Sequence, residues 1–228
     1  MRWMHSLCAL SALLNSAPTL TAQETSQTLQ EKLLNAPPIV RVEEDWELLI
    51  ACPVPEQNLP QIVTVFGPTD ADFGTHTVFE LNHGTLPEFG EGGMQLQVWW
   101  RDLEVGHKAQ HAPTELSFEN ELVTYTTVTR LKEDLLYMEV IRGKSVSYGD
   151  FGNSGLLQMR LYTFRNDLNP YDPDNSIRNS RVTYGANRVN RFVRRAIRFY
   201  KQGNNGPELY CDDTTPTYVH RLATDTGE

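Results

Sequence analysis

The densest positive charge in the chain lies between residues 184 and 200, in the stretch YGANRVNRFVRRAIRFY. Arginine has a planar guanidinium that forms paired hydrogen bonds with carboxylate, sulfate or phosphate, so this stretch is suited to bind an acidic polysaccharide. The chain as a whole is acidic, with a formal net charge of -9. The alternative is therefore that these arginines pair with the protein's own carboxylates. The candidate ligand-binding arginines are Arg188, Arg191, Arg194, Arg195 and Arg198.

A second candidate binding surface lies on the strand predicted between Met94 and Trp100. Gln95, Gln97 and Trp99 alternate there with apolar residues, so they share the polar face of that strand. An indole ring and amide groups together are suited to sugar recognition, because the ring stacks on the sugar and the amides hold its hydroxyls. The alternative is an amphipathic strand whose Trp99 is covered by a loop or a second sheet.

Oxygen-bearing side chains crowd the loop that follows residue 165. Asp167, Asn169, Asp172 and Asp174 offer the hard oxygen ligands that calcium accepts, although their spacing is not that of an EF-hand. Turns formed by Asn and Asp before proline explain the same composition without a metal. Calcium is the one cofactor that the sequence suggests.

The N-terminal segment and the cysteines bear on the compartment. Residues 1–22 have a basic start, a short apolar run and small residues at the end, which is typical of a cleaved export signal. An exported protein meets an oxidising environment, in the periplasm, at the cell surface or outside the cell. Cys52 and Cys211 are therefore expected to form a disulfide that ties the first strands to the last.

The elements that position these residues are predicted to be strands. Apolar residues recur at every second position from Ile39 onward, between turns rich in Gly and Pro, which predicts a single antiparallel two-sheet sandwich of jelly-roll type over residues 39–211. The clearest hairpin pairs 122–131 with 135–142. Residues 23–38 are expected to form a flexible lead-in with a short helical turn at 29–34. Residues 212–228 are expected to form a loosely held tail, in which residues 218–222 can add an edge strand.

The arginine-rich stretch gives two conflicting patterns. Val189, Phe192, Val193, Ala196 and Ile197 fall at helical spacing, which predicts an amphipathic helix. The surrounding strands favour a β-strand instead, and we prefer the strand because it agrees with the rest of the domain.

Three segments, THTVFELNHGTLPEF, GGMQLQVW and YGANRV, resemble a family of secreted proteins from planctomycete-type bacteria. The segment EEDWE at residues 43–47 fits the same resemblance, which covers most of residues 40–202. It implies a concanavalin-like or laminin-G-like β-sandwich. The family has no assigned chemistry that transfers to this chain, and Arg194 and Arg195 depart from the alternation that its strand implies.

Glu43, Asp45 and Glu47 resemble the Glu-x-Asp-x-Glu arrangement of laminarinase-like retaining glycosidases, which share the concanavalin-like fold. Such enzymes need two carboxyl groups about 5 to 5.5 Å apart, one as nucleophile and one as acid and base. The charged Glu44 replaces an apolar residue of that pattern. The alternative is a charged strand face that discourages aggregation.

The sequence therefore predicts an exported β-sandwich module that binds carbohydrate or another cell-surface polymer. The alternatives are a glycan-cleaving enzyme that uses Glu43, Asp45 and Glu47, and a structural envelope protein with no small ligand. The acidic balance disfavours nucleic acid as a partner, and no apolar segment reaches the length of about 20 residues that integral membrane association needs. Motifs for nucleotide binding and for a serine nucleophile are absent from the sequence.

Overall fold

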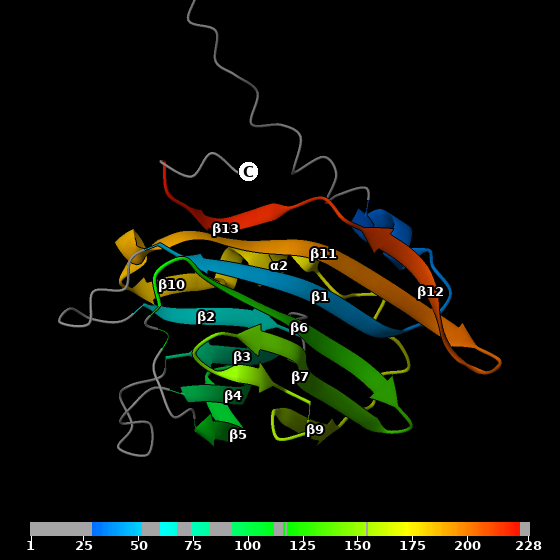
Figure 1. Cartoon of the computed structure of the whole chain (residues 1–228). Coiled ribbons are helices and arrows are strands. Elements are labelled where there is room, and N and C mark those ends of the chain that lie inside the picture. The colour runs from blue at the N-terminus through cyan, green and yellow to red at the C-terminus, as the bar shows by residue number, and fades with distance from the viewer. Residues whose placement is uncertain are drawn as a thin grey trace, which may run out of the picture.

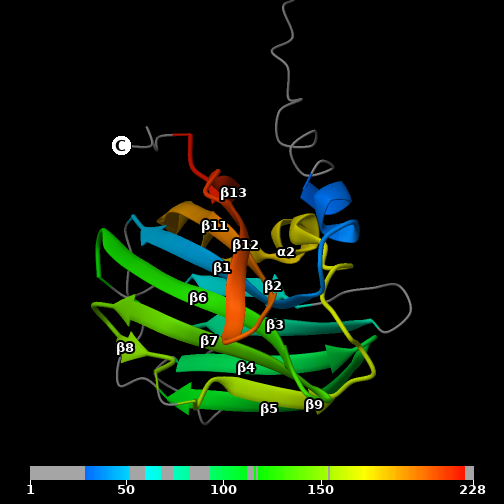
Figure 2. The ribbon, with the colours of Figure 1, turned by 90° about the vertical axis from the view of Figure 1, so that its right-hand side faces the viewer.

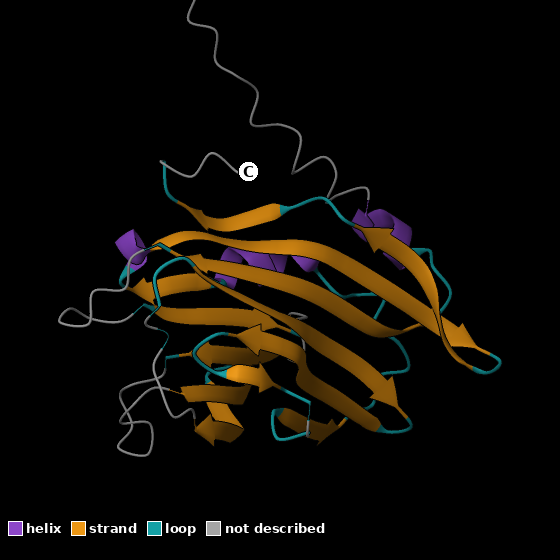
Figure 3. Cartoon of the chain, in the orientation of Figure 1, coloured by secondary structure: helices purple, strands orange, loops and turns teal. Residues whose placement is uncertain are grey.

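The computed structural model describes residues 29–51, 60–67, 74–82, 93–111, 116, 118–153 and 155–223. In these ranges the chain forms two antiparallel β-sheets that pack against each other, with little helix (Figures 1 and 3). The prediction of a mainly β, two-sheet antiparallel sandwich is confirmed. None of the helices in this part of the chain has the length and apolar character that crossing a bilayer requires.

Sheet A is the larger sheet, and its central strands are β11, β1, β6 and β7. In spatial order it runs through β12 (Gly206–Asp213), β11 (Val189–Gly203), β1 (Ile39–Ile50), β6 (Glu121–Lys132), β7 (Leu135–Ser145) and β8 (Gly149–Phe151), with β13 (Thr217–Arg221) also paired to β11 and β9 (Gln158–Tyr162) also paired to β7. Sheet B runs in the order β10 (Arg181–Tyr184), β2 (Gln61–Phe66), β3 (Thr75–Leu81), β4 (Gly93–Trp100) and β5 (Leu103–His111).

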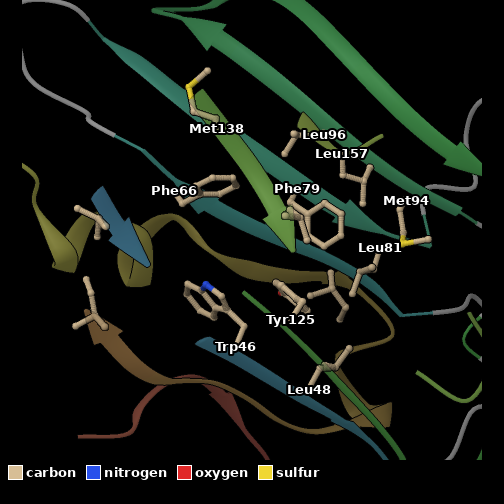
Figure 4. Packing of buried hydrophobic residues seen from close by; sticks show 14 of the residues in the cluster. Trp46, Leu48, Phe66, Phe79, Leu81, Met94, Leu96, Tyr125, Met138 and Leu157 are labelled. Carbon is tan, nitrogen blue, oxygen red and sulfur yellow. The ribbon is translucent and has the colours of Figure 1, made fainter. Parts of the chain in front are cut away.

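The alternation of side chains along β1 explains how the core forms. From Val42 onward the even-numbered residues of this strand point inward, and Trp46, Leu48 and Ile50 are almost completely buried. The facing sheet B contributes Phe79, whose ring meets that of Tyr125 of sheet A edge-on, with centroids 5.2 Å apart. Figure 4 shows Trp46, Leu48, Phe79 and Tyr125 gathered with other buried side chains between the two sheets. Burial of this apolar surface is the main force that holds the sheets together.

The hairpin predicted between 122–131 and 135–142 forms as β6 and β7. Lys132 pairs with Leu135, so Glu133 and Asp134 make a two-residue turn. The backbone of Glu133 has a φ of 54°, in the left-handed region. Two-residue hairpins require such a φ at a loop position, which normally favours Gly, Asn or Asp.

The arginine-rich stretch is the strand β11, as its setting favoured, and not a helix. Its pairing with β1 shifts at three places, and at Ile39 and Arg41 the extra residue belongs to β1. At the other two interruptions the extra residue belongs to β11, because Ile50 and Leu49 pair with Val189 and Arg191, and Asp45 and Trp46 pair with Ala196 and Arg194. Each of these two interruptions inserts one extra residue, at 190 and at 195, as a β-bulge does. The inward positions of β11 therefore fall at Val189, Phe192, Arg194, Ile197 and Phe199. This uneven spacing resembles a helical pattern, which explains the conflicting prediction.

The chain on both sides of the predicted domain is packed onto it where the structure describes it. Residues 29–34 form the expected helical turn, and its Leu29 and Leu33 belong to the buried core. Asn169 donates from Nδ2 to the carbonyl oxygens of Leu33 and Ala36, both at 2.9 Å. At the other end β13 forms the edge strand expected from the sequence. The expected export signal lies outside the described residues.

The expected disulfide between Cys52 and Cys211 is wrong, because Cys211 is a free cysteine. Cys52 itself lies outside the described residues, but the register of β11 explains the result. Ile50, two residues before Cys52, pairs with Val189, whereas Cys211 pairs with Phe199. Ten residues of strand span roughly 33 Å, and two residues of chain after Ile50 reach at most roughly 7 Å, so the gap far exceeds the roughly 4.4 to 6.8 Å between Cα atoms in a disulfide.

The short helix α2 (Pro173–Asn179) closes one side of the sandwich, and Figure 2 shows the chain running up this side from β9 to α2. Arg194 of β11 donates to the carbonyl oxygen of Pro173 at 2.6 Å. Ser180, directly after α2, accepts the backbone N–H of Val65 of β2 at 2.9 Å. This segment therefore links β11 of sheet A to β2 of sheet B. The 3-10 turn η2 (Ala186–Arg188) leads from β10 into β11.

Candidate functional site

Three carboxylates of β1, Glu43, Asp45 and Glu47, lie in a row on the outer face of sheet A. The intervening Glu44 and Trp46 point into the sandwich, because successive side chains of a strand alternate between its faces. These three are the residues that the sequence offered as a catalytic set. The structure places them on one face, and their surroundings indicate what they can do there.

Glu43 is the centre of an ionic network and is only 4% exposed. Its Oε2 accepts from Nη2 of Arg142 at 2.8 Å and from Nη2 of Arg198 at 3.2 Å. The hydroxyl of Tyr200 donates to the same oxygen at 3.3 Å, and Arg41 contacts Oε1. Three guanidinium groups therefore surround one carboxylate.

The other two carboxylates of the row are also paired with arginines. Asp45 contacts Nη2 of Arg198 through Oδ2 at 2.7 Å. Glu47 accepts from Nε of Arg191 at 2.7 Å. Arg195 donates to both oxygens of Glu47, at 3.0 Å from Nε and 2.6 Å from Nη2. This paired geometry is the stronger form of the arginine–carboxylate contact.

The arginines lower the pKa of two carboxylates of the row, Glu43 and Glu47. Burial by itself raises the pKa of Glu43, but Arg41 and Arg142 outweigh it, and the pKa of Glu43 lies below its usual value. Burial likewise raises the pKa of Glu47, but Arg195 and Arg191 bring that pKa below its usual value. A general acid at neutral pH needs a raised pKa. The network therefore favours a stabilising role for the row rather than acid–base catalysis.

Two β-bulges help to place the arginines over the row. Arg195 is the extra residue of β11 opposite Asp45 and Trp46. Arg142 has a φ of 57° and lies where the pairing of β6 with β7 shifts between Thr124 and Thr126. A bulge bends a strand and re-aims its side chains. The guanidinium groups of the two bulged residues consequently reach Glu47 and Glu43.

The remaining two candidate arginines are buried. Arg194 is 6% exposed and donates from Nη1 to Oε1 of Glu44, inside the sandwich, at 3.0 Å. Burial raises the pKa of Glu44, against the opposing effect of Arg194. Arg188 is 4% exposed. The five arginines thus do not form one solvent-facing surface, and four of them contact carboxylates of β1.

The outer face of sheet B carries a hollow of about 430 Å³ that includes two of the residues predicted to bind sugar, Gln97 and Trp99. Valines of β2 and β3 line it together with polar residues of β3. Side chains of residues 97–102, of α2 and of β10 complete the lining. The lining residues are Val63, Val65, His76, Val78, Glu80, Gln97, Trp99, Arg101, Asp102, Asn175, Asn179 and Arg181.

The indole of Trp99 is held in a fixed orientation. Its Nε1 donates to Oε1 of Gln97 at 3.1 Å, and its ring lies nearly parallel to that of His76, with centroids 6.4 Å apart. Burial lowers the pKa of His76, although the carbonyl of Gly74 and the charge of Asp102 oppose this shift. The imidazole is therefore neutral at pH 7.

Gln95, the third predicted sugar-binding residue, is not among the residues that line this hollow. Its side chain is 2% exposed, and its Oε1 has no hydrogen-bond partner in the described part of the chain. It lies one pleat from Gln97, between Glu80 of β3 and Ala109 of β5. Gln95, Gln97 and Trp99 do share one face of β4, but only Gln97 and Trp99 border the hollow.

Sequence reasoning missed the residues that α2 and β10 bring to this hollow. Asn175 and Asn179 of α2 lie one helical turn apart, and Nδ2 of Asn179 donates to the carbonyl oxygen of Asn175 at 2.9 Å. Arg181 of β10 donates from Nη1 to the carbonyl oxygen of Asn179 at 3.3 Å. No local pattern links them to Trp99, because more than 70 residues separate them in sequence.

The oxygen-rich loop proposed for calcium uses its side chains to hold the backbone. Asp167 accepts from the backbone N–H of Asn169, and Asn169 accepts from that of Ile39. Asp172 caps α2 by accepting from the N–H of Asp174 at 3.0 Å, and it also pairs with Arg178. Within the described ranges, no three His, Cys, Asp or Glu side chains gather closely enough to hold a metal ion.

Two comparisons with known proteins add no relationship to this geometry. No protein-family model matches the chain, and no curated protein matches it either.

Proposed function

We propose that this protein is an exported recognition module that binds an uncharged sugar unit in the hollow on the outer face of sheet B. The single observation that carries the proposal is the arrangement of the indole of Trp99, which lies beside amide and guanidinium groups in one hollow of about 430 Å³. A sugar has an apolar ring face and a rim of hydroxyls, and this lining offers a partner for each.

The charges around the hollow favour an uncharged ligand. His76 is neutral at pH 7, and the two cationic residues Arg101 and Arg181 are accompanied by the two acidic residues Glu80 and Asp102. The arginines of β11, which the sequence suggested for an acidic polymer, contact the carboxylates of β1 instead. Recognition is therefore expected to depend on stacking and neutral hydrogen bonds, which salt screens little.

The test is a glycan array followed by titration calorimetry with the best neutral oligosaccharide, at low and at high salt. We expect binding that salt does not weaken and that Trp99→Ala reduces at least about tenfold, as loss of an anchoring aromatic side chain does. Trp99→Phe retains a stacking ring and should recover most of the affinity. Tyr184→Ala removes a half-exposed aromatic residue that lies outside the hollow, and serves as the control.

Two results would contradict the proposal. One is wild-type protein that captures no neutral glycan on the array. The other is binding that is equally strong in Trp99→Ala and in the wild type. Capture that occurs only for sulfated or uronic polymers and disappears at high salt would assign recognition to the arginines of sheet A instead.

A further inference from the structure

A larger groove, of about 1210 Å³, lies at one end of the sandwich, away from the Trp99 hollow. The turn between β6 and β7, the segment that follows β9, and the hairpin between β11 and β12 each contribute to it. None of the residues named for the Trp99 hollow lines this groove. It is therefore a separate surface that needs its own explanation.

Two aromatic side chains of this groove, Tyr162 and Phe164, are 90% and 97% exposed. They are two residues apart, on either side of the less exposed Thr163, so in an extended segment they lie on one side, roughly 6.6 Å apart. Residues 162–165 also line a further hollow of about 400 Å³, distinct from the Trp99 hollow, together with Trp100 and Val105 of sheet B. Exposed apolar groups gathered in this way mark an interaction site.

The backbone that carries these aromatic residues is held in place at both ends. Thr163 donates its N–H to the carbonyl oxygen of Asp134 at 3.0 Å, which fixes the segment to the β6–β7 turn. Leu168, which is fully buried, donates its N–H to the carbonyl oxygen of Ile39 at 2.7 Å. Because the backbone is already ordered, a ligand that stacks on these rings incurs little further loss of backbone entropy.

The charges in the groove are balanced. Arg41 is paired with Glu43, and Arg130 is paired with Glu139 through a contact of 2.9 Å. The other two cationic residues of the lining, Lys132 and Arg165, are matched in number by the acidic Glu133 and Asp134. Neutral hydrogen-bonding side chains complete the lining, at Thr163, Asn166 and Gln202. The groove thus offers no excess charge to attract an anionic polymer or an anionic lipid surface.

We propose that this groove binds a stretch of neutral polysaccharide chain, with sugar rings stacked on Tyr162 and Phe164. A chain of sugar rings satisfies the aromatic faces and the polar side chains together, whereas an acyl chain or an apolar protein surface leaves the polar groups without partners. The larger volume suits several sugar units, and the Trp99 hollow suits a short one. This second surface extends carbohydrate recognition and does not require Trp99.

The experiment is affinity gel electrophoresis through hydroxyethyl cellulose, xyloglucan, galactomannan and laminarin, at low and at high salt. We expect at least one of these polymers to retard the wild type at both salt concentrations. The double variant Tyr162→Ala/Phe164→Ala should bind that polymer at least about tenfold more weakly, with an unchanged melting temperature because both side chains are exposed. Tyr162→Phe/Phe164→Tyr keeps both rings and should retain retardation. Trp99→Ala and Tyr184→Ala should also be retarded.

The variants separate failure of this proposal from failure of the Trp99 site. Retardation that is lost in Trp99→Ala and kept in the double variant overturns the groove and supports the hollow. Retardation that is lost in the double variant supports the groove, whatever Trp99→Ala does to short oligosaccharides. The groove proposal also fails if no polymer retards the wild type. Binding of the wild type to vesicles containing phosphatidylglycerol, lost in the double variant, would then identify the groove as a lipid-contact surface.

Discussion

At the scale of single residues, the arginines of β11, the most basic strand, pair with carboxylates of the protein itself. Glu43 and Glu47 each accept from two or more guanidinium groups, and Glu44 pairs with Arg194 inside the sandwich. Pairs of this kind cost desolvation energy, so their strength depends on good geometry and on the absence of an unpaired partner. The positive charges of β11 are therefore largely compensated by carboxylates of β1, and little of that charge is left for a ligand.

Replacing Glu43 by Gln is expected to destabilise the protein by roughly 3 kcal/mol at pH 7, because three guanidinium groups lose the buried carboxylate that they share. The pKa of Glu43 is lower in the folded state than its usual value. Its stabilising effect is therefore fully present above the usual pKa of about 4.5, and it is lost as pH falls through the lowered, folded-state value. Urea unfolding at pH 7 and at steps below pH 5 should show the difference between wild type and Glu43→Gln shrinking with acid.

Glu208→Gln provides the matched control. Glu208 is largely exposed, and its 3.8 Å contact with Lys201 is a surface pair, for which the measured contribution is typically small. Its substitution should change unfolding little at any pH. If the penalty of Glu43→Gln stays constant down to strongly acidic pH, the ionic network does not stabilise the fold as described.

At the scale of elements, strand positions were predictable and strand irregularities were not. Alternation identified both β1 and β4, and it gave the inward residues correctly at Trp46, Leu48 and Ile50 and at Met94, Leu96 and Val98, but not at Trp100, which is 47% exposed. In β11 the bulges at 190 and 195 turn a period of two into steps of three and two, so the sequence pattern resembled a helix. A bulge is specified by the register of the partner strand, and no window of a single strand contains that information.

The turn between β6 and β7 carries a local conflict that substitution can remove. Glu133 adopts a φ of 54°, a region that is unfavourable for a residue with a Cβ atom by roughly 1 to 2 kcal/mol. Glu133→Gly should therefore raise the free energy of unfolding measured with urea, by up to about 1 kcal/mol after the larger backbone entropy of glycine is counted. Asp134→Gly, in the same turn without a positive φ, should lower it. Equal effects of the two substitutions would contradict this assignment.

At the scale of the whole molecule, the sequence predicted the layers but not what they bring together. The alternation of apolar and polar residues indicates which face of a strand is buried. A series of many short strands indicates two sheets packed together. The Trp99 hollow instead combines β4 with α2 and β10, and the end groove combines two turns with the segment after β9. Those junctions depend on long-range packing. The disulfide prediction was wrong for the same reason, since cysteine count alone does not place Cys211 along β11.

The same long-range packing makes the helical turn at residues 29–34 part of the fold. Replacing its leucines by alanine, one at a time, should show this. Leu33 is fully buried in the core, and its carbonyl oxygen accepts from Nδ2 of Asn169 at 2.9 Å, whereas the neighbouring Leu34 is 61% exposed. Leu33→Ala should cost about 2 to 5 kcal/mol through lost burial and the cavity left behind. Leu34→Ala, the same chemical change one residue later, should stay within about 0.5 kcal/mol of the wild type. Urea unfolding of both variants distinguishes a packed turn from a flexible lead-in, for which the two substitutions would have equally small effects.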